Sequence, residues 1–274
     1  MTIDLTELAD GLQRDPDEVW RGRGAERVSY PAEANDACFA LEEGSFWFAH
    51  RNACLLALLR RFPTAGPFFD IGGGNGFVAA AIQAAGVPVV LVEPGEAGVR
   101  HARARGLRDV VHATLAEAHF RDGSLPAIGF FDVLEHIDDE QSFLAEIRRC
   151  LAPGGRVYLT VPAGRWLWSD DDVQAGHFRR YSCVTLKESL QRAGFRPLLV
   201  SKMFSVLPLP LFLFRSLPSL FGRRRLPTRS YSGLHQPRGR MLMENVWQWE
   251  QTRLDRAQSV PCGTSCLAVA EKTT

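Results

Sequence analysis

Apolar and polar positions follow two alternating patterns along most of the chain. Residues 46–61 carry Leu55, Leu56 and Leu59 at helical spacing, and Phe62-Pro63 predicts the end of that helix. Beyond it, short apolar runs alternate with segments of helical spacing. The runs predict strands at 67–71, 87–94, 109–114, 125–134, 156–163, 196–204 and 264–272, and the segments predict helices at 76–86, 95–106, 139–151 and 184–195.

This alternation is typical of a parallel sheet covered by helices on both faces. We predict an α/β fold with a Rossmann-like, doubly wound, seven-stranded sheet, mostly parallel with an antiparallel last strand. Residues 1–62 would form an N-terminal helical cap, residues 63–204 the core, and residues 263–274 the final core strand. Within the core, Pro153-Gly154-Gly155 predicts a turn before the fifth strand.

Residues 205–262 are far longer than the hairpin that an antiparallel pair of strands needs. They are rich in proline, leucine, arginine and tryptophan, and residues 245–255 predict a helix. We therefore expect a substrate-shaping helical insertion before the last strand. Its first part, residues 205–227, joins a proline-broken apolar stretch to an arginine cluster and is too short and interrupted to span a bilayer. It predicts a peripheral membrane contact, a substrate lid or an oligomer contact.

The composition limits the classes of partner and the cellular location that we expect for this protein. The 274 residues carry a formal net charge of +1, which gives no general attraction for nucleic acid, so no nucleic-acid partner is expected. The first twenty residues contain acids and no apolar run, which predicts neither a secretory signal nor a membrane span and favours a cytoplasmic location. The six cysteines lie among apolar neighbours and predict reduced thiols.

A glycine-rich loop lies between the first predicted core strand and the helix that follows it. Such a loop lets a ligand approach the backbone N–H groups at a helix N-terminus. Gly74, Gly76 and Ala79 fit the dinucleotide fingerprint, and Glu93 follows where an acid would bind the ribose. This register leaves a nicotinamide-dependent oxidoreductase open as an alternative function.

Asp70 distinguishes between a dinucleotide cofactor and S-adenosylmethionine. A carboxylate at the mouth of the loop would repel a pyrophosphate. S-adenosylmethionine has no phosphate and carries a sulfonium and an ammonium, so an acid at the loop and another at the ribose suit its charge pattern. We therefore favour this cofactor, with a non-catalytic nucleoside-binding protein as a further alternative.

Five motifs occur in order: FFDIGGGNG, VVLVEP, HATLAE, FFDVLEHIDD and LAPGGRVYLTVPA. With them the chain resembles the class I S-adenosylmethionine-dependent methyltransferase superfamily, in a type-11-like branch, over residues 46–204 and the final strand. The resemblance implies S-adenosylmethionine as cofactor and S-adenosylhomocysteine as product. The cofactor-binding residues that it implies are Arg51, Asp70, Gly72, Gly73, Gly74, Asn75, Glu93, Pro94, Thr114, Leu115 and Asp132.

Within that set the resemblance assigns roles. Asp70, the glycines and Asn75 would hold the methionine end, with Arg51 at its carboxylate, and Glu93 would hold the ribose. Pro94 would cover one face of the adenine. Thr114 and Leu115 replace the acid often found there, so backbone and packing contacts would hold the base. Trp47 and Arg51 would belong to a lid with Trp47 near the substrate, and an ordinary apolar staple is the alternative for this segment.

Methyl transfer to a hydroxyl or an ammonium needs a base. His177 lies in a polar, aromatic loop after the fifth strand, at the edge where open parallel sheets place ligands, and is the first candidate. Its GHFRRY stretch resembles a recurrent one in this branch. His136 and Tyr181 are further catalytic candidates.

Arg179 and Arg180 could clamp an acceptor phosphate or carboxylate. Alternatively they pair with the acids at 170–172 and order the loop. Asp132, Glu135 and His136 have the spacing of a divalent-metal triad, but the same LEH stretch is common in metal-free relatives, and we predict no metal. The predicted function is an enzyme of EC 2.1.1 type that transfers a methyl group to O or N of a small molecule, a sugar or glycolipid intermediate being one class.

Overall fold

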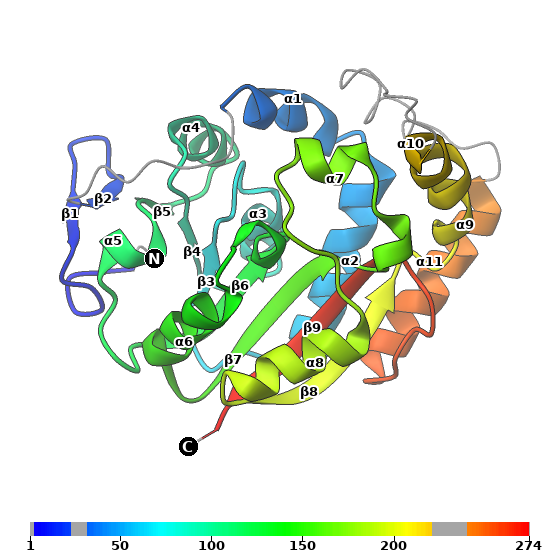
Figure 1. Ribbon diagram of the computed structural model, residues 1–274. Coiled ribbons are helices and arrows are strands. Elements are labelled where there is room, and N and C mark those ends of the chain that lie inside the picture. Colours follow the sequence, from blue (N-terminus) through cyan, green and yellow to red (C-terminus); the bar gives the residue numbers. More distant parts are fainter. Residues whose placement is uncertain (1–2, 23–31, 221–239, 274) are drawn as a thin grey trace.

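The computed structural model describes residues 3–22, 32–220 and 240–273 (Figure 1). Within them nine strands form one sheet, in the order β1-β2-β5-β4-β3-β6-β7-β9-β8. The strands are β1 (Leu12–Arg14), β2 (Trp20–Gly22), β3 (Phe68–Ile71), β4 (Val89–Val92), β5 (Asp109–His112), β6 (Leu125–Phe131), β7 (Leu151–Pro162), β8 (Phe195–Met203) and β9 (Ser265–Lys272).

The predicted fold class is confirmed. Strands β3 to β7 pair in parallel, and β9 lies antiparallel between β7 and β8. The predicted number of seven strands is wrong, because β1 and β2 form a hairpin that extends the sheet beside β5. Residues 12–22 therefore add strands to a segment expected to be a helical cap. These strands have three residues each, too few for a period of two to be recognised.

Helices cover both faces of the sheet (Figure 1). One core cluster gathers apolar side chains of α6 and α8 against the sheet, and the other gathers those of α2, α3, α4 and α11. The helices before the insertion are α1 (Ala32–Glu42), α2 (Phe46–Arg61), α3 (Phe77–Ala84), α4 (Glu96–Ala104), α5 (Leu115–Ala118), η1 (Leu134–His136), α6 (Glu140–Cys150), η2 (Arg165–Leu167), α7 (Asp170–Gln174) and α8 (Cys183–Arg192).

The predicted turn at 153–155 is wrong as a separate element. Strand β7 begins at Leu151 and runs through these residues. Its pairing with β6 shifts register between Leu125 and Ala127, so an irregularity in the strand pair absorbs the extra residues. Gly154 supplies the positive φ of 71° that this geometry requires.

The insertion contributes α9 (Pro208–Leu211), a π-helical turn η3 (Phe212–Ser216), α10 (Leu217–Leu220) and α11 (Arg240–Asp255). Helix α11 contains the helix predicted at 245–255 and packs along α2 (Figure 1). The arginine cluster that ends the 205–227 segment lies outside the described residues. Among the helices of the described ranges, none combines the length and the apolar character needed to cross a membrane.

Strand register brings three acids to one edge of the sheet. Asp70 lies in β3, Glu93 directly follows β4, and Asp132 directly follows β6. Because β4, β3 and β6 are parallel neighbours, their carboxyl ends meet at the same edge. The glycine loop from β3 to α3 lies there too, and its Gly76, with a φ of 74°, caps α3.

Candidate active site

Asp70 is a fully buried acid. Among the described residues, neither of its carboxylate oxygens has a hydrogen-bond partner. Burial raises the pKa of Asp70 to about 7, with the charge of Arg51 opposing the rise and that of Glu93 adding to it. A Cβ on Gly73 would lie 2.8 Å from Oδ2 of Asp70, so the loop needs a glycine to pass the carboxylate. The site therefore contains an acid to which none of the described residues donates a hydrogen bond.

Glu93 accepts hydrogen bonds from the backbone of the loops that follow β3 and β4. Its Oε2 accepts a hydrogen bond from the backbone N–H of Gly74 at 2.8 Å, and its Oε1 accepts one from the N–H of Gly95 at 2.8 Å. Burial raises the pKa of Glu93, while these two hydrogen bonds oppose the rise. Gly98 completes the contact, because a Cβ there would lie 2.8 Å from both Cγ of Glu93 and the carbonyl oxygen of Gly74. The next residue, Pro94, receives a contact from His112 Nε2 to its carbonyl oxygen at 3.1 Å.

Arg51 connects α2 to the end of β6. Its Nη1 donates to Oδ2 of Asp132 at 2.7 Å, and Thr160 Oγ1 donates to Oδ1 at 3.1 Å. The guanidinium lies 5.0 Å from the ring centroid of Trp47 and 5.1 Å from that of Phe48. Asp132 has a φ of 56°, which is unusual for a residue other than glycine. The structure thus brings the predicted lid residues and Asp132 together.

Other predicted cofactor residues have structural contacts of their own. Asn75 is buried, and its Nδ2 donates to the carbonyl oxygen of Asn35 at 2.9 Å. Thr114 caps α5, with its Oγ1 accepting from the N–H of Glu117 at 3.1 Å, and Leu115 is buried. Gly72 has a φ of 68°, in the left-handed region that favours glycine. For these residues a cofactor role stays a prediction.

His177 is oriented by an acid. Its Nδ1 lies 2.9 Å from Oδ1 of the buried Asp172, and Arg180 Nε donates to the same oxygen at 2.7 Å. Burial alone would raise the pKa of Asp172, but the hydrogen bonds from His177 and Arg180 bring it below its usual range. Asp172 is therefore ionised, and His177 Nδ1 carries the hydrogen between them. Sequence reasoning treated this acid only as an arginine partner, although Ser169 and Asp172 form a capping box that marks the start of α7.

His136 and Glu135 lie against His177. The two histidine rings meet edge to face, with centroids 4.7 Å apart. Burial, followed by the charge of His177, lowers the pKa of His136 to about 4, and burial raises the pKa of Glu135 well above its usual range. Ligand atoms of these three residues lie within 4.8 Å of one another, a grouping that could hold a metal ion. The prediction of a metal-free site stays a prediction.

Tyr181 and Arg179 bind α6. Tyr181 Oη donates to Oε2 of Glu140 at 2.7 Å, and Arg179 Nη1 donates to the same oxygen at 3.3 Å. Burial raises the pKa of Tyr181, and the neighbouring Glu140 adds to the rise. Together with the pairing of Arg180 and Asp172, these contacts favour the alternative in which the arginines order the loop. Catalytic or substrate-binding roles for the three residues stay predictions.

Residues 47–200 match the family model described as "Methyltransferase domain". The chain belongs to this methyltransferase family. The match confirms the superfamily predicted from the five motifs, whose donor is S-adenosylmethionine.

Curated relatives agree with this family. A probable S-adenosylmethionine-dependent methyltransferase from Mycolicibacterium smegmatis is 34% identical over 160 residues, which cover 57% of this chain and 61% of the relative. One from Mycobacterium tuberculosis (strain H37Rv) is 30% identical over 159 residues, with 57% of each chain covered. The matched region thus spans between 57% and 61% of the length of these relatives.

Solved methyltransferase structures share the fold. Phosphoethanolamine N-methyltransferase 2 of Haemonchus contortus, in complex with S-adenosyl-L-methionine, superposes with a TM-score of 0.56 at 21% identity, covering 90% of this chain and 59% of that one. An S-adenosylmethionine-dependent methyltransferase from Thermotoga maritima gives 0.55 at 18% identity, covering 89% and 100%. At these identities the likeness concerns the fold alone.

Proposed function

We propose that this protein is an S-adenosylmethionine-dependent methyltransferase that methylates O or N of a small-molecule acceptor. The observation that supports this most is Asp70, a buried carboxyl group with no hydrogen-bond partner among the described residues. Leaving a buried polar group unpaired costs free energy. The ammonium of a bound S-adenosylmethionine would supply the missing donors and a compensating charge.

Glu93 suits the ribose of the same molecule. Each carboxylate oxygen has two lone pairs, and each oxygen of Glu93 accepts one backbone N–H in this structure. One lone pair per oxygen is left for the two ribose hydroxyls. The loop contacts also fix the carboxylate before the ligand arrives, which lowers the entropic cost of binding.

Arg51 suits the methionine carboxylate. Its guanidinium pairs with Asp132, and its buried Nε has no hydrogen-bond partner in the part of the chain that the structure describes. A ligand carboxylate beside this guanidinium would take the unused donor. Trp47, whose ring lies against the guanidinium, would close over the same end of the cofactor.

The reaction needs orientation and removal of one proton. The acceptor O or N forms a bond to the methyl carbon while the S–CH₃ bond breaks, and its electron pair stays on sulfur to give S-adenosylhomocysteine. Holding the two reactants in line supplies much of the rate. We assign the acceptor proton to Nε2 of His177, because Nδ1 is held by the ionised Asp172.

Apolar side chains beside the loop support a sugar or glycolipid acceptor with a lipid portion. Trp166 is 56% exposed and Phe214 is 62% exposed. The two segments that carry them touch, because the rings of Trp166 and Phe212 lie 5.4 Å apart. Such a surface suits an acyl chain or the outer layer of a membrane. We therefore include a peripheral membrane contact in the proposal.

Calorimetry with S-adenosylhomocysteine and with NADH separates the two cofactor classes. We expect saturable binding of the first and none of the second. Saturable NADH binding without heat from S-adenosylhomocysteine would favour the oxidoreductase alternative. A screen of acceptors with methyl-labelled cofactor would then identify where the methyl group goes, and binding without any turnover would favour the non-catalytic alternative.

A further inference from the structure

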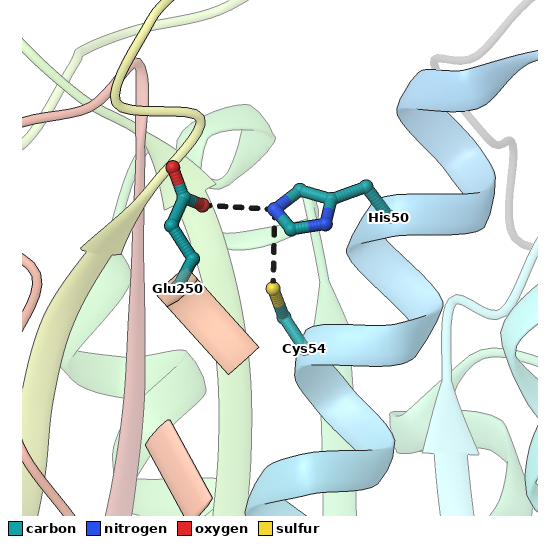
Figure 2. A group of neighbouring side chains, drawn as sticks. All are labelled: His50, Cys54 and Glu250. Carbon is teal, nitrogen blue, oxygen red and sulfur yellow. Dashed lines mark hydrogen bonds and ion pairs between the residues drawn. The ribbon is translucent and has the colours of Figure 1, made fainter. Parts of the chain in front are cut away.

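A buried carboxylate of the insertion joins three separate segments of the chain, and Figure 2 shows its contact with His50. Glu250 lies in α11 and is completely buried. Its Oε1 accepts from the backbone N–H and the hydroxyl of Ser205, both at 2.6 Å. Its Oε2 accepts from the backbone N–H of Phe204 at 2.9 Å and lies 2.8 Å from Nε2 of His50 in α2. We call these residues the Glu250 network.

The network works through hydrogen bonds and charge. Burial alone would raise the pKa of Glu250, but the hydrogen bonds from His50 and Ser205 bring it below its usual range, so the carboxylate is ionised. Burial raises the pKa of the Cys54 thiol, whose Sγ lies 3.5 Å from His50 Nε2. The thiol of the metal-free protein therefore stays protonated. Removing the carboxylate would leave several buried donors without an acceptor.

The network continues into the cofactor site. Phe204 stacks on Trp47 with centroids 5.2 Å apart, and the guanidinium of Arg51 lies 5.0 Å from the centroid of the same Trp47 ring. Arg51 in turn pairs with Asp132. His50 and Arg51 are consecutive residues of α2, so a shift or rotation of this helix moves both. The contacts are continuous from the insertion to the end of β6.

Aromatic stacking holds α11 against α2 beside the carboxylate. Trp247 lies one turn before Glu250, and its ring stacks on Phe46 at 5.1 Å and on His50 at 5.2 Å. Helix α11 of the insertion therefore packs against one side of the first turns of α2. Their other side carries Arg51 to the candidate active site.

We propose that Glu250 is a positioning residue that couples docking of the insertion helix to cofactor affinity, by fixing α2 and through it Arg51. This inference rests on the proposed function, since Arg51 is assigned to the methionine carboxylate there. Because a coupling free energy is reciprocal, bound cofactor would in turn hold α11 against the core. Helix α11 would thus be held against α2 more firmly when the methyl donor is present.

Glu250→Gln tests the proposal with S-adenosylhomocysteine as the ligand. Glutamine keeps the size and an acceptor oxygen, but it loses the charge that holds His50. We expect Kd to rise about tenfold, the range of coupling found within one hydrogen-bond network. The matched control is Asp255→Asn, which removes the exposed ion pair between Arg60 and Asp255 on the same two helices, 3.1 Å between Nη2 and Oδ1. Its Kd should stay within about twofold.

A double-mutant cycle separates positioning from mere stability. In an Arg51→Gln background the further change to Glu250→Gln should alter Kd by less than about twofold, because the path to the ligand is already cut. If Glu250→Gln lowers only the melting temperature, or weakens binding equally in both backgrounds, the proposal is overturned. Ser205→Ala removes one donor from the network and gives the same test at smaller amplitude should Glu250→Gln not fold. If the unaltered protein binds no S-adenosylhomocysteine, the proposed function itself fails.

Discussion

Two regions of the proposed site pair their polar groups in opposite ways: the ends of β3 and β4, here called the cofactor half, and the loop after β7 that carries His177, here called the acceptor half. In the cofactor half, among the described residues, Asp70 has no hydrogen-bond partner and Glu93 accepts from two backbone N–H groups. In the loop after β7, His177 and Arg180 share the carboxylate of Asp172. The first half has acids that a ligand can neutralise, whereas the second is ordered by its own ion pairs.

This difference indicates how each half would select its ligand. Unpaired or backbone-bound acids select a ligand by charge, which suits a cofactor that carries a sulfonium and an ammonium. A loop held by internal pairs selects by shape and by the few groups left facing the ligand. Asp172 orients His177, and under the proposed function the exposed apolar side chains of this region, such as Trp166 and Phe178, would limit what can approach it.

The largest effect is expected from Asp172→Asn in the acceptor half. An amide there no longer demands the hydrogen on Nδ1 of His177, so Nε2 would carry it and lose its capacity as a base. With an acceptor identified by the screen, single-turnover methyl transfer should slow about a hundredfold or more, the range of general base catalysis. Affinity for S-adenosylhomocysteine should not change.

Asp171→Asn is the control for that experiment. Asp171 lies next to Asp172 in α7 and pairs with Arg215 at 3.1 Å, so its loss alters the same helix without touching His177. We expect nearly unaltered turnover. Equal rate losses in both variants would indicate that the loop is merely disordered and that His177 is not the base.

In the cofactor half, Asp70→Asn should separate stability from binding. Without the charged acceptor for the ligand ammonium, Kd for S-adenosylhomocysteine should rise about thirtyfold, as for loss of a hydrogen bond to a charged group. The free protein should be at least as stable above pH 7, because a buried unpaired charge is removed. Calorimetry and thermal unfolding of the same samples check both statements. Unchanged affinity would contradict the assigned role of Asp70.

The two halves also differ in how far the sequence could predict them. The motifs located Asp70, Glu93 and Asp132, because a strand followed by glycines or by an acid is a local pattern. The partner of Arg51 in this structure is 81 residues away, and that of His50 is 200 residues away. Such pairs depend on how helices dock, which residue spacing does not encode. Asp172 is the exception, since its capping box was readable and its contact with His177 spans only five residues.

Binding to the cofactor half should depend on pH with a sign set by Asp70. Its folded-state pKa of about 7 lies above the ordinary value of 3.8, so the folded protein takes up a proton that the unfolded chain lacks between these limits. Stability from this group therefore falls as pH rises from 4 to 7. Ligand binding has the opposite sign, because the ammonium needs the ionised carboxylate.

Affinity for S-adenosylhomocysteine should therefore weaken up to about tenfold per pH unit below 7 and level off above it. Calorimetry near neutral pH in two buffers of different ionisation enthalpy should detect proton release on binding. Asp70→Asn should abolish that release. Release that persists in this variant would assign the titration to another group, such as the buried Glu93, whose charge acts on Asp70 and whose pKa is also raised.

The smallest effect is expected from Tyr181→Phe, which tests whether this residue belongs to the chemistry or to the order of the acceptor half. Its hydroxyl donates to Glu140, which also accepts from Arg179 and from Ser189 Oγ at 2.7 Å. Removing one bond from a carboxylate with other donors should cost about 1 kcal/mol of stability. Turnover should stay within about twofold, since His177 keeps Asp172 as its partner. A rate loss comparable to that of Asp172→Asn would instead place Tyr181 in contact with the acceptor.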